Sequence, residues 1–229
     1  MASAATAASL VAAPTPSPLP RATRDAGRRT RRALLDAAAV LFAERGLSGV
    51  SLADIAAVSG TFPSQVTYYF GSKEGLFVEA ASREVLHLAA RVEAAGARSK
   101  TRQEYARVMA REALRSPALL TFAEALLLAR QRPELAPLVA RTVDRLHTQG
   151  AKAVTARCAV TGWPLWAPAE AVSQDFWAVV LGLVLTRAGS GGVFDHAAAE
   201  AAVLAALSMG YRRAGNQRSA APRRRTTSR

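Results

Sequence analysis

Cysteine and histidine, the residues that most often build metal and redox sites, are scarce in this sequence. Its 229 residues include one cysteine, Cys158, and three histidines. A single cysteine forms no disulfide within the chain and no cysteine-based metal cluster. His87, His147 and His196 lie far apart, and none belongs to a pair at metal-ligand spacing. The sequence therefore predicts neither a metal nor another cofactor, and it suits a reducing cytoplasm.

Motifs typical of catalysis are missing as well. Cys158 has no histidine near it in the sequence. The glycine-rich run from Gly189 to Gly192 follows an expected helix, whereas a phosphate-binding loop follows a strand. We therefore expect that the protein is not an enzyme.

Acidic residues are few, and the excess of basic residues is concentrated at the two ends. The chain has 30 Lys and Arg against 17 Asp and Glu, a formal net charge of +13. The first 32 residues carry six arginines and one aspartate, and residues 212–229 carry seven arginines and no acid. Basic ends indicate a polyanionic partner such as nucleic acid, although tails of this kind also serve simply to keep a protein soluble.

Long hydrophobic runs are rare, although half of the residues are hydrophobic. No uninterrupted apolar stretch reaches the ~20 residues needed to span a bilayer, so no membrane association is expected. Residues 1–27 are rich in Ala, Pro and Arg and lack the charged start of a signal peptide, so we expect a disordered leader. Residues 214–229 are expected to form a disordered basic tail.

The spacing of apolar residues predicts an all-α protein. Alanine, the best helix former, dominates the apolar class. From Arg28 onward, apolar residues recur at steps of three and four, the period of a helix with one buried face. Glycines and prolines at the breaks predict where helices begin and end. The expected helices cover residues 28–45, 52–59, 63–70, 73–95, 102–115, 117–130, 134–160, 168–188 and 196–213.

Residues 28–79 contain three short helices with a glycine turn between the second and third, the arrangement of a helix-turn-helix DNA-binding domain. Ser51 precedes the second helix, and Asp54 follows three residues later, which is the pattern of a capping box. These residues are therefore predicted to form a small, separate DNA-binding domain.

The third of these helices has two different sides. Val66, Tyr69 and Phe70 share one face and are expected to pack on the first two helices. The other side is left for base edges, thymine methyls and phosphates in a major groove. It carries Pro63, Ser64, Gln65, Thr67 and Tyr68.

This segment strongly resembles the TetR family of bacterial regulators. The matching residues are Ala38, Leu41, Phe42, Gly46, Ser51, Leu52, Ile55, Ala56, Gly60, Tyr69, Phe70, Ser72, Lys73, Glu74 and Leu76. The resemblance implies a homodimer that binds a palindromic operator in double-stranded DNA. It also implies a variable helical C-terminal domain that binds a small-molecule effector and mediates dimerisation.

The resemblance further assigns roles to individual residues. The family's groove-reading positions fall on the five outward residues of the third helix, from Pro63 to Tyr68. Ser51 and Lys73 match positions that contact phosphates, which place a protein on DNA without reading its sequence. Two residues depart from the family pattern: Thr67 stands where Tyr is usual, and Phe62 stands where Ser or Thr often caps the third helix. Phe62 is instead a candidate for a hydrophobic staple.

We hypothesise that four arginines near the start of the first helix also contribute to this interface. Arg28, Arg29, Arg31 and Arg32 are expected to supply nonspecific affinity, since each neutralised phosphate steepens the salt dependence of binding. For Arg21 and Arg24, the alternative is a solvated leader.

Residues 80–213 are expected to form the effector-binding and dimerisation domain. The resemblance implies that the last two helices pair with those of a second copy, and the alternative is that they are core helices of a monomer. Glu124 either orients a cationic or hydroxylated ligand, or it simply faces solvent or pairs with an arginine. Aromatic and aliphatic residues are candidate walls of an effector cavity, although ordinary core packing explains each one singly: Phe122, Leu126, Leu127, Trp163, Trp166, Phe176 and Trp177.

These observations predict a sequence-specific transcriptional regulator at the bacterial nucleoid, a repressor released by a small apolar or aromatic ligand. One alternative is a nonspecific DNA-coating protein, which would show steep salt dependence without sequence preference. The other is a helical enzyme or small-molecule-binding protein without a DNA role, which would be indifferent to changes at Thr67 or Tyr68.

Overall fold

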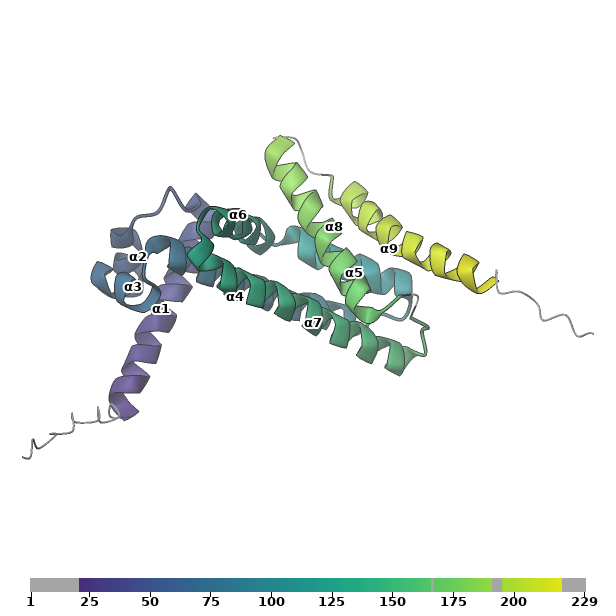
Figure 1. The fold of residues 1–229 in the computed structure, drawn as a ribbon, viewed down its shortest axis with the longest axis horizontal. Coiled ribbons are helices and arrows are strands. Elements are labelled where there is room, and N and C mark those ends of the chain that lie inside the picture. The colour runs from purple at the N-terminus through teal and green to yellow at the C-terminus, as the bar shows by residue number, and fades with distance from the viewer. Residues whose placement is uncertain (1–20, 166, 191–194, 220–229) are drawn as a thin grey trace, which may run out of the picture.

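The computed structural model describes residues 21–165, 167–190 and 195–219, and all regular structure within them is helical (Figure 1). The order of elements is α1 (Arg21–Arg45), α2 (Leu52–Ser59), α3 (Pro63–Phe70), α4 (Lys73–Gly96), α5 (Arg102–Arg115), α6 (Ala118–Gln131), the short 3-10 helix η1 (Pro133–Leu135), α7 (Ala136–Thr161), α8 (Ala169–Ser190) and α9 (His196–Ser219). The all-α prediction is confirmed.

Two predicted boundaries are wrong at the ends of the chain. Helix α1 begins at Arg21, so residues 21–27 are not part of a disordered leader. Its first turns project from the body of the molecule, where no apolar stripe is needed (Figure 1). Helix α9 continues to Ser219, past the predicted end of order at residue 213. The remainder of the expected leader and tail, residues 1–20 and 220–229, lies outside the described residues.

One internal boundary is also wrong. Helix α8 runs to Ser190, so Gly189 and Ser190 belong to the helix rather than to the predicted glycine loop. A glycine weakens a helix by only about 1 kcal/mol, which the flanking residues of a long helix readily offset. Gly191 and Gly192 lie outside the described residues.

The first three helices pack together on the start of α4. The buried side chains at this junction include Leu34 and Phe42 of α1, Ile55 of α2, Val66 of α3 and Phe77 of α4. The rings of Phe42 and Phe77 meet edge to face, with centroids 5.1 Å apart and planes at 87°. This geometry is favourable because the positive edge of one ring faces the negative face of the other.

Local capping determines where α2 begins and ends. The Ser51 hydroxyl accepts the Asp54 N–H, and the Asp54 carboxylate accepts the Ser51 N–H at 2.8 Å, which confirms the predicted capping box. A hydrogen bond of 2.6 Å from the Ser51 hydroxyl to the Asp54 carboxylate, together with the bond from the Ser51 N–H, lowers the pKa of Asp54. Gly60 ends the helix with φ +64°, a left-handed conformation that side chains with a Cβ avoid. The chain can therefore turn sharply into α3.

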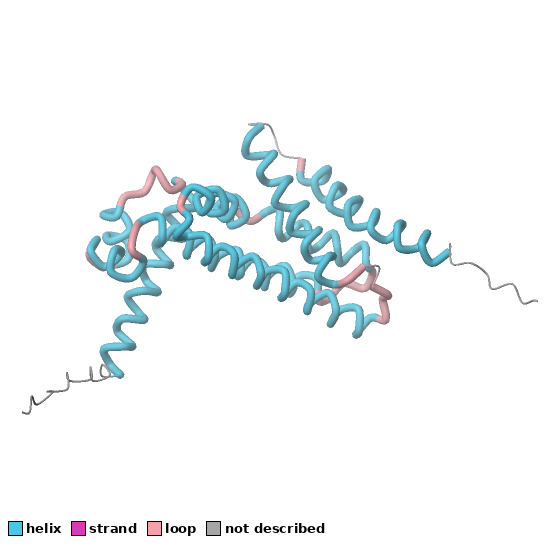
Figure 2. The backbone as a smooth tube through the Cα atoms, viewed as in Figure 1, coloured by secondary structure: helices cyan, strands magenta, loops and turns pink. Residues whose placement is uncertain are grey.

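Helix α4 connects this small unit to the C-terminal helices, which cross one another in a bundle (Figure 2). It packs on α1 and α3 near its start and on α5, α6 and α7 along its length. Helices α8 and α9 lie at the far end of the molecule from α1–α3 (Figure 1). A bidentate pair between Arg111 and Glu200, at 2.9 and 3.1 Å, holds α9 on α5.

Among the described helices, α8 is long and apolar enough, by length and composition alone, to cross a membrane. One of its faces, including Val172, Phe176 and Val180, is buried against neighbouring helices. That burial is typical of a core helix in a soluble protein, and the apolarity of its other face needs a separate explanation.

The junction at Phe77 is expected to dominate the stability of the N-terminal unit. Phe77→Ala should lower the free energy of unfolding by roughly 3–5 kcal/mol, because it removes a fully buried ring and leaves a cavity. Phe62→Ala, the same change at a ring that is 73% exposed, should change it by less than about 0.5 kcal/mol. Urea unfolding of both variants measures the difference, and equal losses would contradict this account of the core.

Candidate functional site

Helix α3 is anchored by one face and exposed on the other. Val66 is completely buried, and Tyr69 and Phe70 are half-buried against the core, as predicted. Pro63, Ser64, Thr67 and Tyr68 are exposed on the opposite side. Tyr68 is 80% exposed and rests edge-on against Tyr69, with ring centroids 4.9 Å apart. The helix therefore presents a short polar and aromatic surface on a rigid support.

Gln65 and Phe62 together form the start of α3. The Gln65 carboxamide oxygen accepts the Phe62 N–H at 3.2 Å, which leaves the Gln65 amino group as a free donor on the outer side. The Phe62 ring is 73% exposed, so the idea that it acts as a hydrophobic staple is wrong. The ring has no apolar partner because the start of α3 points toward solvent. It remains an exposed aromatic group at the start of α3 instead.

Lys73 has an intramolecular role that sequence reasoning missed. Its ammonium donates to the carbonyl oxygens of Leu47 at 2.9 Å and Val50 at 2.8 Å. These carbonyls belong to the connection between α1 and α2, so Lys73 ties that connection to the start of α4. An ammonium has three donors, and one remains for a phosphate. Ser51, the other expected phosphate contact, is exposed beside this connection.

The four arginines of the expected arm divide into two groups. Arg28, Arg29 and Arg32 are exposed on α1, and Arg28 pairs with Asp25 one turn earlier. Arg31 pairs with Glu79 of α4 and lies over the Phe70 ring, 4.9 Å from its centroid. Arg31 therefore holds α1, α3 and α4 together and does not belong to a flexible arm.

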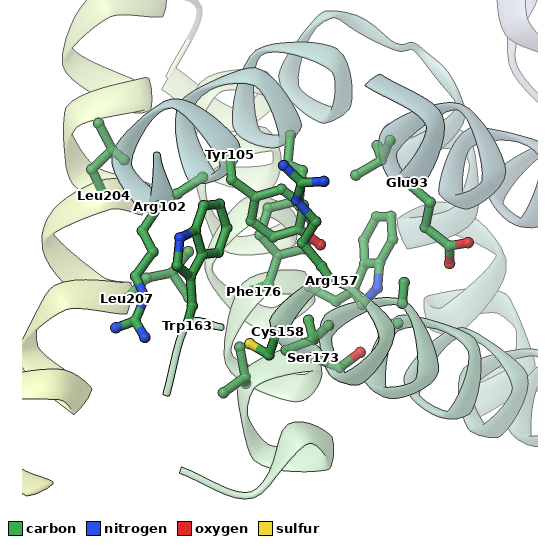
Figure 3. Close-up of a pocket in the computed structure, with 18 of the residues that line it drawn as sticks. Glu93, Arg102, Tyr105, Arg157, Cys158, Trp163, Ser173, Phe176, Leu204 and Leu207 are labelled. Atoms are coloured by element: carbon green, nitrogen blue, oxygen red, sulfur yellow. The ribbon is translucent and has the colours of Figure 1, made fainter. Parts of the chain in front are cut away.

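A cavity of about 540 Å³ lies in the C-terminal domain, enclosed by residues of α4, α5, α7, α8 and α9 (Figure 3). Its walls are mostly apolar and aromatic. Phe176, Trp177 and Trp163, which were candidates from the sequence, line it. A pocket of this size and character is typical of a small-molecule site.

The other candidate wall residues are not confirmed. Phe122 and Leu126 belong to α6, which packs on α4 outside this cavity, so neither lines it. Phe122 is a core residue, and Leu127 is 55% exposed. Glu124 is exposed and also lies away from the cavity. Trp166 lies outside the described residues.

Several polar residues of the cavity were not predicted, because they come from helices that only the fold brings together. They are Glu93 of α4, Arg102 and Tyr105 of α5, Arg157 and Cys158 of α7, and Ser173 of α8 (Figure 3). Burial, with smaller contributions from Glu93 and Cys158, raises the pKa of Tyr105 to about 12. Its hydroxyl therefore remains protonated and can donate a hydrogen bond.

Both parts of the chain match known proteins. Residues 34–80 match the family model for bacterial regulatory proteins of the tetR family, and residues 102–205 match that for a bacterial transcriptional repressor C-terminal domain. A solved transcriptional regulator from Rhodococcus sp. RHA1 is 35% identical, over 80% of this chain and 95% of that one, with a TM-score of 0.69. The chain belongs to the TetR family of bacterial transcriptional regulators.

Other TetR-family relatives agree with this assignment. The HTH-type transcriptional repressor KstR2 of Rhodococcus jostii (strain RHA1) is 43% identical over 65 residues, which are 28% of this chain and 31% of that protein. The solved multidrug binding protein EbrR, complexed with imidazole, is 25% identical over 79% of this chain and 92% of that one, with a TM-score of 0.51. The TetR assignment makes this protein a DNA-binding repressor and not an enzyme, and TetR-family regulators dimerise and bind small-molecule effectors.

The two carbonyl bonds of Lys73 are expected to stabilise the DNA-binding unit. Lys73→Met should lower the free energy of unfolding by about 1–3 kcal/mol, because two acceptors lose a charged donor. Lys100→Met, at an exposed lysine in the connection after α4, is the matched control and should have almost no effect. Urea unfolding measures both, and a control loss as large as that of Lys73→Met would contradict the role.

Proposed function

We propose that this TetR-family repressor binds a palindromic operator as a homodimer, reads it with α3, and releases it when a small molecule occupies the cavity. The observation that carries the proposal is the division of α3 into a buried face at Val66 and an exposed face at Thr67 and Tyr68. A helix held in this way can enter a major groove, which is about 12 Å wide, without deforming.

The reading surface would consist of Pro63, Ser64, Gln65, Thr67 and Tyr68. The Ser64 and Thr67 hydroxyls and the free Gln65 amino group offer hydrogen bonds to base edges, and the Thr67 methyl suits a thymine methyl. The exposed Tyr68 ring adds contact area beside them. Thymine-containing steps facing Thr67 are therefore part of the proposed recognition.

Phosphate contacts would hold α3 in register on the duplex. Ser51 is exposed at the end of the connection between α1 and α2, and Lys73 binds two carbonyls of the same connection with one donor remaining. Arg28 and Arg29 would add positive charge from the projecting part of α1. We assign positioning, rather than sequence reading, to these four residues.

Selection of binding sites from random duplex DNA at roughly 0.15 M salt tests the reading surface, because this salt weakens contacts that involve only phosphates. The wild type should enrich a palindrome. The Thr67→Ala/Tyr68→Ala variant should bind it about 10- to 100-fold more weakly in fluorescence anisotropy, through lost base contacts. The control Lys152→Ala/Thr155→Ala, at exposed positions of α7, should bind like the wild type. Binding without sequence preference would favour a DNA-coating protein instead.

The proposed dimer contact is the outer face of α8 and α9. On α8, the exposed positions Ala178, Gly182 and Leu185 follow one another at helical spacing. On α9, Ala201 and Ala202 are exposed in the same way. Small side chains let helices approach closely, and an apolar face that the domain leaves uncovered accounts for the apolar composition of α8. A second copy would cover it in a symmetric four-helix contact.

Charges placed on this face should separate the subunits. Ala178→Arg/Ala202→Arg is expected to convert a dimer to a monomer in light scattering, because it would bury two unpaired cations per subunit. Ala156→Arg/Ala159→Arg, at exposed alanines of α7, is the matched control and should remain dimeric. A wild-type monomer, or a dimer that survives the α8/α9 substitutions, would contradict the proposed contact.

The cavity is the proposed effector site, and the cytoplasm at the nucleoid is the proposed location. The EbrR structure, which contains imidazole, supports a small-molecule role for this fold. Helix α4 contributes Val92 and Glu93 to the cavity, and its other end packs on α3. A ligand would favour release only if it binds the DNA-incompetent arrangement more tightly than the competent one.

A further inference from the structure

We propose that the effector is an amphipathic organic anion, with an apolar ring body and a carboxylate that accepts a hydrogen bond from Nε–H of Arg157. This inference rests on the proposed function insofar as it treats the cavity as the effector site. It goes beyond that proposal because it names the chemistry of the ligand and the residue that recognises it.

Arg157 brings a charge into the cavity without a countercharge. Its Nη1 donates to the Ala97 carbonyl at 2.8 Å, and its Nη2 donates to the Ser99 carbonyl. The Trp163 ring lies 5.2 Å from the guanidinium carbon. Among the residues that the structure describes, no carboxylate forms an ion pair with Arg157.

The third donor group of this guanidinium, Nε–H, is unpaired. The Nε atom of Arg157 is buried and has no hydrogen-bond partner, while the residue lines the cavity. A guanidinium stays charged in proteins, so deprotonation cannot relieve the cost of burying it. Because Nε itself has almost no accessible surface, an acceptor in the cavity reaches it only when the side chain shifts, and an anionic acceptor then forms the stronger, charge-assisted bond.

Ser173 supplies a second unpartnered polar group. Its side chain is 3% exposed, and its hydroxyl has no hydrogen-bond partner. It packs so closely on Gly150 of α7 that a Cβ there would lie 2.3 Å from the Ser173 oxygen. Gly150 and Arg157 are two turns apart on α7, an axial rise of roughly 10 Å. The hydroxyl is therefore a second unpaired polar group of the cavity wall, at a distance from Arg157 along α7.

The space between these two groups accepts a ring system. Phe176 and Trp177 meet edge to face, with centroids 5.1 Å apart, and both line the cavity together with Met109. Tyr105 and Trp163 form a second aromatic pair, 6.0 Å between centroids, on the side of Arg157 (Figure 3). Aromatic and thioether walls of this kind favour a flat apolar body.

The remaining charged groups favour an anion over a cation. Glu93 is the carboxyl group of the cavity, and in Figure 3 it lies on the opposite side from Arg102 and Leu207. Burial raises the pKa of Glu93, so its surroundings favour the neutral form. The permanent charge in the cavity wall is therefore positive.

The position of Arg157 connects this recognition to α4. The carbonyl of Ala97, which it binds, belongs to the residue that immediately follows the last residue of α4. Helix α4 begins at Lys73, beside the DNA-binding helices. An anion on Nε would therefore act on a guanidinium that holds the far end of the helix joining the two sites.

Three naphthalene probes of one shape and different charge test the proposal on the full-length protein. Naphthalene-2-carboxylate, naphthalene-2-carboxamide and 2-naphthylmethylammonium would be titrated by calorimetry at pH 7. The carboxylate should bind at least about 10-fold more tightly than the carboxamide, because its hydrogen bond is charge-assisted, and the ammonium should bind more weakly than both. A carboxamide or ammonium that binds as tightly as the carboxylate, or a carboxylate that does not bind, would overturn the proposal.

Substitutions test whether the preference for the carboxylate probe comes from Arg157. Arg157→Gln should make the carboxylate and carboxamide bind equally, and Arg157→Lys should keep part of the preference because it keeps the charge. Arg130→Gln, at an exposed arginine of α6 outside the cavity, should behave as the wild type. Thermal unfolding establishes that each variant is folded. If Arg157→Gln does not fold, Arg157→Lys decides whether Arg157 causes the charge preference. A preference retained without Arg157 would overturn the assignment.

Operator binding by the same preparations separates this inference from the proposed function. If DNA binding is specific but no probe shows a charge preference, the ligand class is wrong and the DNA role stands. If the charge preference is found while sequence-specific DNA binding is absent, the proposed function is wrong and the anion site stands.

Discussion

The packing of α4 against α1 and α3 is the contact on which the rest of the molecule depends. Phe77 is buried at this junction against Phe42, and Val66 fixes the inner face of α3 to the same core. A helix of eight residues is too short to be stable alone in water, so α3 exists because this core supports it. Its outer face is therefore not needed for packing and is free to recognise DNA.

Electrostatic contacts around this core also fix the geometry of the helices. Lys73 holds the connection between α1 and α2, and Arg31 joins α1 to Glu79 and covers the Phe70 ring. Basic residues of this domain thus serve two purposes. Those that face inward fix the geometry of the helices, and those that face outward, such as Arg29, remain available to a polyanion.

The cavity follows a different principle from the DNA-binding surface. Its apolar walls bury area without specifying an orientation, and orientation comes from the few polar groups that the fold leaves unpaired, the Nε atom of Arg157 and the hydroxyl of Ser173. Unpaired buried donors are costly, and of the three such side-chain atoms in the described part of the chain two lie here, while the third is the Ser82 hydroxyl of α4. Helix α4 contributes to this region at one end and to the DNA-binding unit at the other.

The sequence by itself determined the helices whose ends carry local signals. Ser51, Gly60 and Pro63 predicted the bounds of α2 and α3, since caps and glycine turns act within a few residues. The division of α3 into inner and outer faces followed from its period of 3.6. Only the tertiary structure decided that Arg31 and Lys73 bind within the domain, and that Arg157, Ser173 and Tyr105 share a cavity while Phe122 does not. These residues lie on helices whose pairing depends on packing between distant segments, and no local pattern in the sequence records that pairing.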